Sequence, residues 1–596
     1  MNFGRGEGGS DIQRNQPQAL EQPAQIRCLR ILNWVGLGLG LGLAIAAKLA
    51  VSARADAPFS IPVIDPGGDP SVKAYDLGPI SLDQQEESGV PSTIPVTLTG
   101  LLGLPPGTDP VPLVVLLHGR HRGCHFAAPA PSQWPCPVGQ ETRFDQGLAY
   151  LTDGLTRAGL AVLVPNLNGA FTDTHGAGPE NRNRLADQRG QQLIDAHLKR
   201  LAIASHGGPN PFSQPLNGRL NWHQLALVGH SMGGGAAALS ALNRQDQTSP
   251  KQIQQGLGAV AALVLVSPTR SHPLGDYPQA YQLADVPTVV MLGGCDRDIL
   301  DYSSLYYLET AYRDQFRRTP VLGLMLLGAN HNFFNTAIDY DDYYRWPNHA
   351  SLCDPQRSDQ RLSRVIQEQW LQHFLVEFLT MVLPDQGSSG RSGLGLAPDR
   401  PAPDRIYDQP VLTNLVWPSR RRYTLFRAGD EASVYQPSPN LQVIPCGAFR
   451  PCDGRERSPA FPTVLRLRWR QSDQELVFPL PPKDFRDFSS LQLRLAGVEE
   501  LPPSSTSAPL GIVLRDRHGG AIRLDLPPTT TALSPLMRDP DTSPFTYPSA
   551  LRIPLAQFRG VDLATLSSLE LRFDGMPQGS LDLAGIEFLS RAEGEW

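Results

Sequence analysis

The sequence predicts two folded parts, a mainly parallel sheet with helices on both faces and then an all-β sandwich. Over residues 58–384, short continuous apolar runs alternate with helical stretches, whereas period-two alternation dominates from residue 411 onward. At 596 residues the chain is too long for one ordinary core, so two domains plus tails are expected.

Residues 1–57 predict a polar N-terminus followed by an export signal or anchor. Arg27 and Arg30 precede the apolar run Ile31–Ala47, and the small residues Ala53 and Ala55 follow it. The run has about 17 residues, which is short for a transmembrane helix, so cleavage after Ala55 is favoured over an uncleaved anchor. The chain is therefore expected to be secreted, periplasmic or held in the cell envelope.

Cysteine usage agrees with export. Of the seven cysteines, one lies in the N-terminal segment and six follow: Cys124, Cys136, Cys295, Cys353, Cys446 and Cys452. Six cysteines allow fifteen pairings. Closeness along the chain favours Cys124–Cys136 and Cys446–Cys452, which leaves Cys295–Cys353; buried free thiols are the alternative. The net charge of −6, with scattered Lys and Arg, argues against a nucleic-acid surface.

The first part is expected to hold seven strands that are buried on both faces, because their apolar runs are continuous. They are Thr93–Leu98, Leu113–Leu117, Ala161–Val164, Leu225–Val228, Ala261–Val266, Thr288–Leu292 and Val321–Leu327. Helices are expected at Leu185–Leu201, Met232–Asn243 and Arg361–Leu383. The last helix places Ile366, Trp370, Phe374 and Phe378 on one face, which predicts a core-facing stripe.

Residues 385–410 are rich in Gly, Ser and Pro and predict a linker. Beyond it, Leu465, Leu467 and Trp469 alternate with arginines, and Leu514–Leu526 predicts a hairpin that turns at Gly519 and Gly520. Such alternation indicates strands with one solvent-exposed face. Residues 411–596 are therefore expected to form a β-sandwich.

The segment Gly229-His230-Ser231-Met232-Gly233 lies between an apolar strand and a helix of small residues. A G-x-S-x-G segment at a strand-to-helix turn holds its serine in a strained conformation and exposes the hydroxyl. The Met232 amide, at the helix N-terminus, would face developing negative charge. Ser231 is therefore the expected nucleophile.

A serine nucleophile needs a base and an acid, which follow it in the order Ser, Asp, His in this type of sheet. Asp296 and Asp298 follow the strand Thr288–Leu292, and His331 follows the strand Val321–Leu327. Asp296 is preferred as the acid, with Asp298 as the alternative. His331 is the expected base.

The loop His118-Gly119-Arg120 follows the strand Leu113–Leu117. Its glycine permits a sharp turn, so the amides of Arg120 and Met232 are expected to form an oxyanion hole. The histidines His118, His121 and His125 raise a metal alternative, but their spacing matches no familiar ligand set, so no metal site is predicted.

Together these motifs resemble the α/β-hydrolase superfamily over about residues 75–383, in particular chlorophyllases, platelet-activating-factor acetylhydrolases and cutinase-like polyester hydrolases. The resemblance implies a triad of Ser231, Asp296 and His331, carboxylic ester substrates and no cofactor. The insertion 122–139 departs from the pattern, and a Cys124–Cys136 bridge would make it a stiff flap. Residues 411–596 resemble a carbohydrate-binding-like jelly roll, mainly in Leu551-Arg552-Ile553-Pro554-Leu555, in Phe558 and in Val561-Asp562-Leu563. This resemblance implies glycan contact, with a structural or interaction module as the alternative.

The sequence therefore predicts an exported serine hydrolase that cleaves small or polymeric carboxylic esters. One alternative is a non-catalytic, glycan-binding envelope protein with a hydrolase-like scaffold. The other is a serine peptidase or amidase.

Overall fold

The computed structural model describes residues 71–85, 91–124, 134–172, 182–269, 281–299, 303–343, 353–354, 361–383, 394–430, 432–447, 463–498, 509–527, 529–533 and 547–591. All of them belong to one compact unit, Ser60–Trp596. The predicted export segment, His125 and Cys452 lie outside these ranges. No helix in the described part of the chain is long and apolar enough to cross a bilayer.

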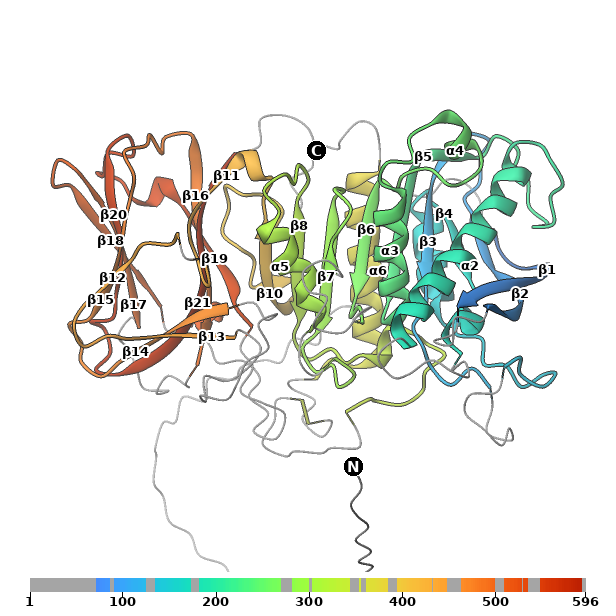
Figure 1. Cartoon of the computed structure of the whole chain (residues 1–596), viewed down its shortest axis with the longest axis horizontal. Coiled ribbons are helices and arrows are strands. Elements are labelled where there is room, and N and C mark those ends of the chain that lie inside the picture. The colour runs from blue at the N-terminus through green and yellow to red at the C-terminus, as the bar shows by residue number, and fades with distance from the viewer. Residues whose placement is uncertain are drawn as a thin grey trace, which may run out of the picture. The chain divides into compact units, whose positions relative to one another are not determined.

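A mixed sheet of ten strands forms the centre of the first part (Figure 1). Its strands are β1 (Ser71–Gln85), β2 (Pro91–Leu104), β3 (Val111–Leu117), β4 (Ala161–Pro165), β5 (Leu220–His230), β6 (Ala262–Val266), β7 (Thr288–Gly293), β8 (Val321–Leu326), β9 (Arg405–Ile406) and β10 (Gln409–Val416). Their order is β1-β2-β4-β3-β5-β6-β7-β8-β10-β9. The strands from β4 to β8 in this order run parallel, and β2 and β10 flank them antiparallel. All seven predicted strands are present, but Thr93–Leu98 in β2 is not buried on both faces: Ile94, Val96 and Leu98 are buried, whereas Thr93, Pro95 and Thr97 are exposed, as is typical of an antiparallel strand near the edge of a sheet.

Helices cover both faces of this sheet, as predicted (Figure 1). They are α1 (Ala149–Arg157), α2 (Arg182–Ser205), α3 (Met232–Arg244), α4 (Pro250–Gln254), α5 (Tyr306–Arg313) and α6 (Arg364–Val382). Alternate residues of β3 face opposite ways, so that Val115 packs in one apolar core with α2, α3 and α5, and Val114 packs in a second core with α1 and α6.

The predicted apolar stripe of α6 is correct for three of its four members. Trp370, Phe374 and Phe378 are buried, whereas Ile366 is 39% exposed. The buried side chain of the first turn is Gln367, whose amide exchanges hydrogen bonds of 3.0 and 2.9 Å with the backbone of Asn330. A polar side chain thus occupies the inward position because it satisfies a buried backbone group.

The predicted linker and the sandwich boundary at residue 411 need correction. Strand β10 pairs with β8 and extends the first sheet, although it lies mostly beyond that boundary. Leu394 and Leu396, within the predicted linker, are buried in the same core as α6. A breaker-rich segment cannot build a core of its own, but it can still insert single apolar side chains into an existing one.

The C-terminal part is an antiparallel β structure of two sheets (Figure 1). Its strands are β11 (Arg422–Arg427), β12 (Gln436–Pro437), β13 (Gln442–Gly447), β14 (Thr463–Trp469), β15 (Glu475–Pro479), β16 (Phe488–Gly497), β17 (Leu510–Asp516), β18 (Ala521–Leu526), β19 (Ser549–Pro554), β20 (Leu566–Arg572) and β21 (Gly579–Ser590). One sheet has six strands and the other five, and apolar side chains from both sheets share one core. The hairpin formed by β17 and β18 is confirmed.

The central strands of the six-stranded sheet lack the solvent-exposed face that alternation predicted, whereas Gln442 at the β13 edge is exposed. Polar side chains on its outer face, among them Ser490, Gln492 and Arg494 of β16, are buried. Ser490 Oγ donates a hydrogen bond of 2.5 Å to the Pro398 carbonyl, and Gln492 Nε2 donates one of 2.9 Å to the Leu415 carbonyl. Period-two alternation distinguishes polar from apolar faces, but it does not distinguish a face in water from one that is bonded to another part of the chain.

An ion pair lies at the centre of this contact. The guanidinium of Arg494 pairs with the carboxylate of Glu309 on α5, with one contact of 3.2 Å, and lies 3.9 Å from the ring centroid of Tyr312. Both charged side chains are at most 10% exposed. The pair joins α5 of the first part to β16 of the C-terminal part. Removal of either partner would leave the other charge buried and uncompensated, so we expect the pair to stabilise this contact.

We expect Glu309→Ala to lower the free energy of unfolding by about 3–5 kcal/mol, since it leaves Arg494 buried without its counter-charge. Equilibrium urea unfolding measures the change. Arg486→Ala, which breaks the exposed ion pair with Asp484, is the matched control and should have almost no effect. A Glu309→Ala protein as stable as the wild type would contradict the assigned role.

Candidate active site

Ser231 lies in the turn between β5 and α3, with backbone angles of φ 56° and ψ −125°. A non-glycine residue with positive φ stores about 1–3 kcal/mol of strain, so the surrounding structure must hold it. The Ser231 amide donates to the Val266 carbonyl at 2.9 Å, and its carbonyl accepts from the Thr269 amide at 3.1 Å. A Cβ at Gly229 would lie 2.3 Å from the Gly233 carbonyl oxygen, which explains why glycine is required in this turn.

The loop that follows β3 lies directly against this serine. A Cβ at Gly119 would lie 2.6 Å from the Cβ of Ser231 and 3.2 Å from its Oγ. Arg120 follows Gly119, and Met232 is the first residue of α3. The two amides predicted to form an oxyanion hole thus belong to residues adjacent to this contact, and their role stays a prediction.

Asp296 and His331 meet beyond the carboxyl ends of β7 and β8. His331 Nδ1 donates a hydrogen bond of 2.8 Å to Asp296 Oδ2, and neither side chain is exposed. The other carboxylate oxygen of Asp296 accepts the amides of Asp298 and Ile299 at 3.0 and 2.8 Å. The acid is therefore fixed by its own loop as well as by the histidine.

Asp298, the alternative acid, is placed differently. Its side chain is 56% exposed, and its Oδ2 lies 3.7 Å from His331 Nε2, not from Nδ1. An acid that orients a catalytic histidine bonds to one ring nitrogen and leaves the other for the nucleophile. The geometry of Asp296 fits that role and the geometry of Asp298 does not.

His230, the residue before Ser231, brings the histidine loop to the serine turn. Its Nε2 donates a hydrogen bond of 3.1 Å to the backbone carbonyl of His331, and the two imidazole rings are 4.8 Å apart between centroids. His331 Nε2 is buried and has no hydrogen-bond partner. The imidazole of His331 thus lies against the residue that precedes Ser231, and its Nε2 is not used by another hydrogen bond.

The charges around His331 favour its protonated form. Burial alone lowers the pKa of His331, but the negative charges of Asp296, Asp298 and Asp342, with the hydrogen bond to Asp296, raise it to about 9. A raised pKa means that this site stabilises an imidazolium ion.

The other histidines near the site stay neutral. Burial lowers the pKa of His118, whose Nε2 accepts the Leu167 amide at 2.8 Å, so this side chain fastens the loop after β3 to the loop after β4. Burial, followed by the charges of His331 and His118, lowers the pKa of His121 to about 3. Within the described ranges, no group of three or more His, Cys, Asp or Glu residues could hold a metal ion.

Two of the predicted disulfides are confirmed, Cys124–Cys136 and Cys295–Cys353. The first closes the insertion 122–139, which follows Gly119. The second joins the loop after β7, which carries Asp296 (the acid loop), to the segment around Cys353. Cys446 is also disulfide-bonded, and its predicted partner lies outside the described residues. Disulfides of this kind are typical of proteins outside the cytosol.

Asp342 is a site residue that the sequence did not predict. Its carboxylate accepts backbone amides from both the acid loop and the histidine loop, including Arg297 N at 2.8 Å and His331 N at 3.1 Å. No motif or spacing marks this residue in the sequence; the only signal is the acidic run Asp339-Tyr340-Asp341-Asp342.

Comparisons with known proteins add little. No model of a known protein family matches the chain, and no curated protein matches it in sequence. One similar solved structure is a dienelactone hydrolase-like promiscuous phosphotriesterase from metagenomic libraries, at 13% identity and a TM-score of 0.30, covering 53% of this chain and 100% of that chain.

Proposed function

We propose that this protein is a serine hydrolase that cleaves carboxylic esters through an acyl-enzyme intermediate. Ser231 Oγ attacks the ester carbonyl carbon while His331 Nε2 takes the hydroxyl proton, and Asp296 stabilises the resulting imidazolium. The amides of Arg120 and Met232 bind the oxyanion. The ester C–O bond then breaks, and the leaving alcohol takes the proton from His331. A water molecule then attacks the acyl-enzyme with the same assistance from His331, which releases the carboxylic acid and restores Ser231.

The observation that carries this proposal is the buried Asp296–His331 pair, in which His331 contacts His230, the residue before the strained Ser231, and keeps Nε2 without a hydrogen-bond partner. The three groups come from loops at the carboxyl ends of β5, β7 and β8, the edge at which parallel sheets bind ligands. Stabilising a positive charge at His331 lowers the barrier to proton transfer from the serine.

We further propose that the protein acts outside the cytosol, in a secreted or envelope-bound form. Its disulfides support this location, since thiols stay reduced in most cytosols. The outer face of the five-stranded sheet does not favour the glycan-binding alternative. Among its described residues, ion pairs such as Arg515–Glu570 and Arg523–Asp574 lie on this face.

Hydrolysis of p-nitrophenyl acetate and p-nitrophenyl butyrate by the full chain tests the proposal. Turnover of both esters, with little release of p-nitroaniline from the matching anilides, is the expected result. Preference for the anilides would favour the peptidase or amidase alternative. Absence of all turnover would favour a non-catalytic protein.

The pH dependence of kcat/KM should report the charge state of His331. A general base works only when neutral, so kcat/KM should rise between pH 7 and the pKa of His331, about 9, and level off above it. Melting temperatures over the same range serve as a control for unfolding. A profile that is flat between pH 7 and pH 9 would contradict the assigned environment of His331.

A further inference from the structure

Asp342 connects the two loops that hold the proposed base and acid. Its Oδ2 accepts the Arg297 amide at 2.8 Å, next to Asp296. Its Oδ1 accepts the His331 amide at 3.1 Å and the Asn332 amide at 3.2 Å, and Oδ2 also lies 3.3 Å from the His331 amide. One carboxylate thus satisfies three backbone N–H groups on two segments of the chain.

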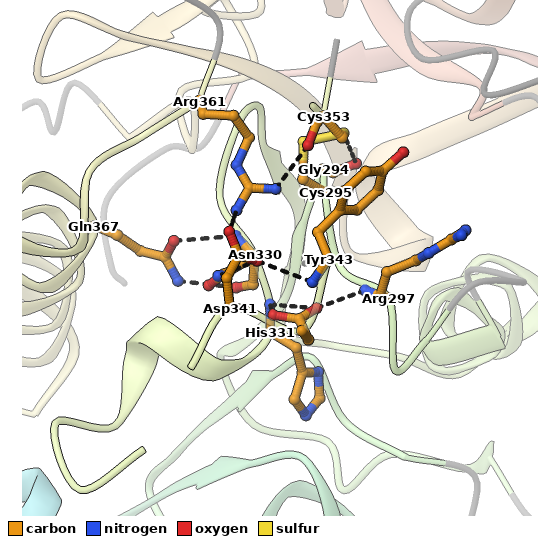
Figure 2. Close-up of a disulfide and its surroundings, with 11 residues drawn as sticks. Gly294, Cys295, Arg297, Asn330, His331, Asp341, Tyr343, Cys353, Arg361 and Gln367 are labelled. Carbon is orange, nitrogen blue, oxygen red and sulfur yellow. Dashed lines mark hydrogen bonds and ion pairs between the residues drawn. A yellow bond between two sulfur atoms is a disulfide. The ribbon is translucent and has the colours of Figure 1, made fainter. Parts of the chain in front are cut away.

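The carboxylate of the preceding residue, Asp341, belongs to a second hydrogen-bond network, which Figure 2 shows. Asp341 Oδ1 accepts Asn330 Nδ2 at 3.0 Å and the Tyr343 amide at 2.9 Å, and Asp341 Oδ2 pairs with Arg361 at 2.5 Å. Arg361 in turn donates to the carbonyl of Cys353, which is disulfide-bonded to Cys295. The loop that carries Asp342 is therefore fixed by the hydrogen bonds of Asp341 as well as by those of Asp342.

We propose that Asp342 is a positioning residue, which holds the His331 and Asp296 loops in register and supplies negative charge that supports the imidazolium form of His331. This inference rests on the proposed function. A purely structural residue would only stabilise the loops, whereas Asp342 is proposed both to align the loops and to raise the pKa of His331. The loops should lose alignment, and the pKa of His331 should fall, when the charge is removed.

The surroundings of Asp342 support both effects. Charged hydrogen bonds to backbone amides are stronger than neutral ones, so a carboxylate fixes these loops better than an amide could. The charged groups that act on the Asp342 carboxylate are Asp296 and His331. Burial, followed by the charge of Asp296, raises the pKa of Asp342 to about 6, so the carboxylate is ionised in the range where His331 titrates.

The test compares Asp342→Asn with Asp339→Asn, which removes the same charge from an exposed position in the same loop. For Asp342→Asn, kcat on a p-nitrophenyl ester should fall roughly 10- to 100-fold, because small displacements of catalytic groups have effects of this size. KM should stay nearly unchanged, since the variant removes no ester contact. The midpoint of the pH profile should also move to lower pH. Asp339→Asn should match the wild type in all three quantities.

Several outcomes would overturn the proposal. An Asp342→Asn protein that keeps the kcat and pH midpoint of the wild type contradicts it, as does one that loses only thermal stability. If the Asn variant does not fold, Asp342→Glu keeps the charge but displaces the carboxylate. It should lower kcat without moving the midpoint, and an unchanged kcat would overturn the inference.

Failure of this inference is distinguishable from failure of the proposed function. A fluorophosphonate probe that labels the wild type at Ser231 supports the nucleophile whatever Asp342 does. Normal labelling together with an unaffected Asp342→Asn variant would reject only the positioning role. Loss of the Ser231 assignment itself would reject both.

Discussion

Ser231→Ala should abolish ester hydrolysis, with kcat lower by roughly a million-fold, because the variant lacks the oxygen that we propose as the nucleophile. The remaining rate would come from binding and oxyanion stabilisation alone. Progress curves with p-nitrophenyl butyrate, at enzyme concentrations high enough to detect slow turnover, measure this loss.

Ser240→Ala is the matched control for this variant. Ser240 is a buried serine in α3, the helix that begins immediately after Ser231, and it lies outside the proposed machinery. It should retain the kcat of the wild type. Near-normal hydrolysis by a folded Ser231→Ala protein would refute the nucleophile.

Asp296→Asn should lower kcat by roughly 10,000-fold, the second largest effect that we expect. An amide can donate a hydrogen bond to His331 Nδ1, which would place the ring proton on Nε2 and prevent that nitrogen from accepting the serine proton. The amide also removes a charge that stabilises the imidazolium. Steady-state kinetics with the same ester measure the loss.

Asp298→Asn provides a comparison within the same loop. Its carboxylate is exposed and lies 3.7 Å from Nε2, so removal of its charge should change kcat only a few-fold and move the pH midpoint slightly to lower pH. If instead Asp298→Asn were the inactive variant and Asp296→Asn the active one, the acid would have to be reassigned.

The central part of the fold could be predicted from the sequence because its signals are local. Continuous apolar runs such as Val114–Leu117 are buried on both faces of the sheet, and the absence of alternating polar residues in the run indicates this burial. The same holds for the turn around Ser231, where glycine is needed at close backbone contacts. Position at the end of a strand was enough to place His331 and Asp296 in the same site.

Other features depend on partners that are distant in the sequence. The pairing of β10 with β8 depends on tertiary contact across a breaker-rich segment, so composition gave no indication of it. The outer face of β16 reads as solvent-exposed, although Arg494 meets a carboxylate 185 residues away. Asp342 binds backbone amides, which every residue other than proline carries. The residue types of its partners therefore do not mark this role in the sequence.

The most direct test of the proposed site is mass spectrometry of the full chain after treatment with a fluorophosphonate probe. We expect one phosphonyl group per chain, located by peptide fragmentation on Ser231, with labelling that becomes faster as the pH rises towards the pKa of His331. An unmodified chain, or an adduct on another residue with Ser231 untouched, would contradict it.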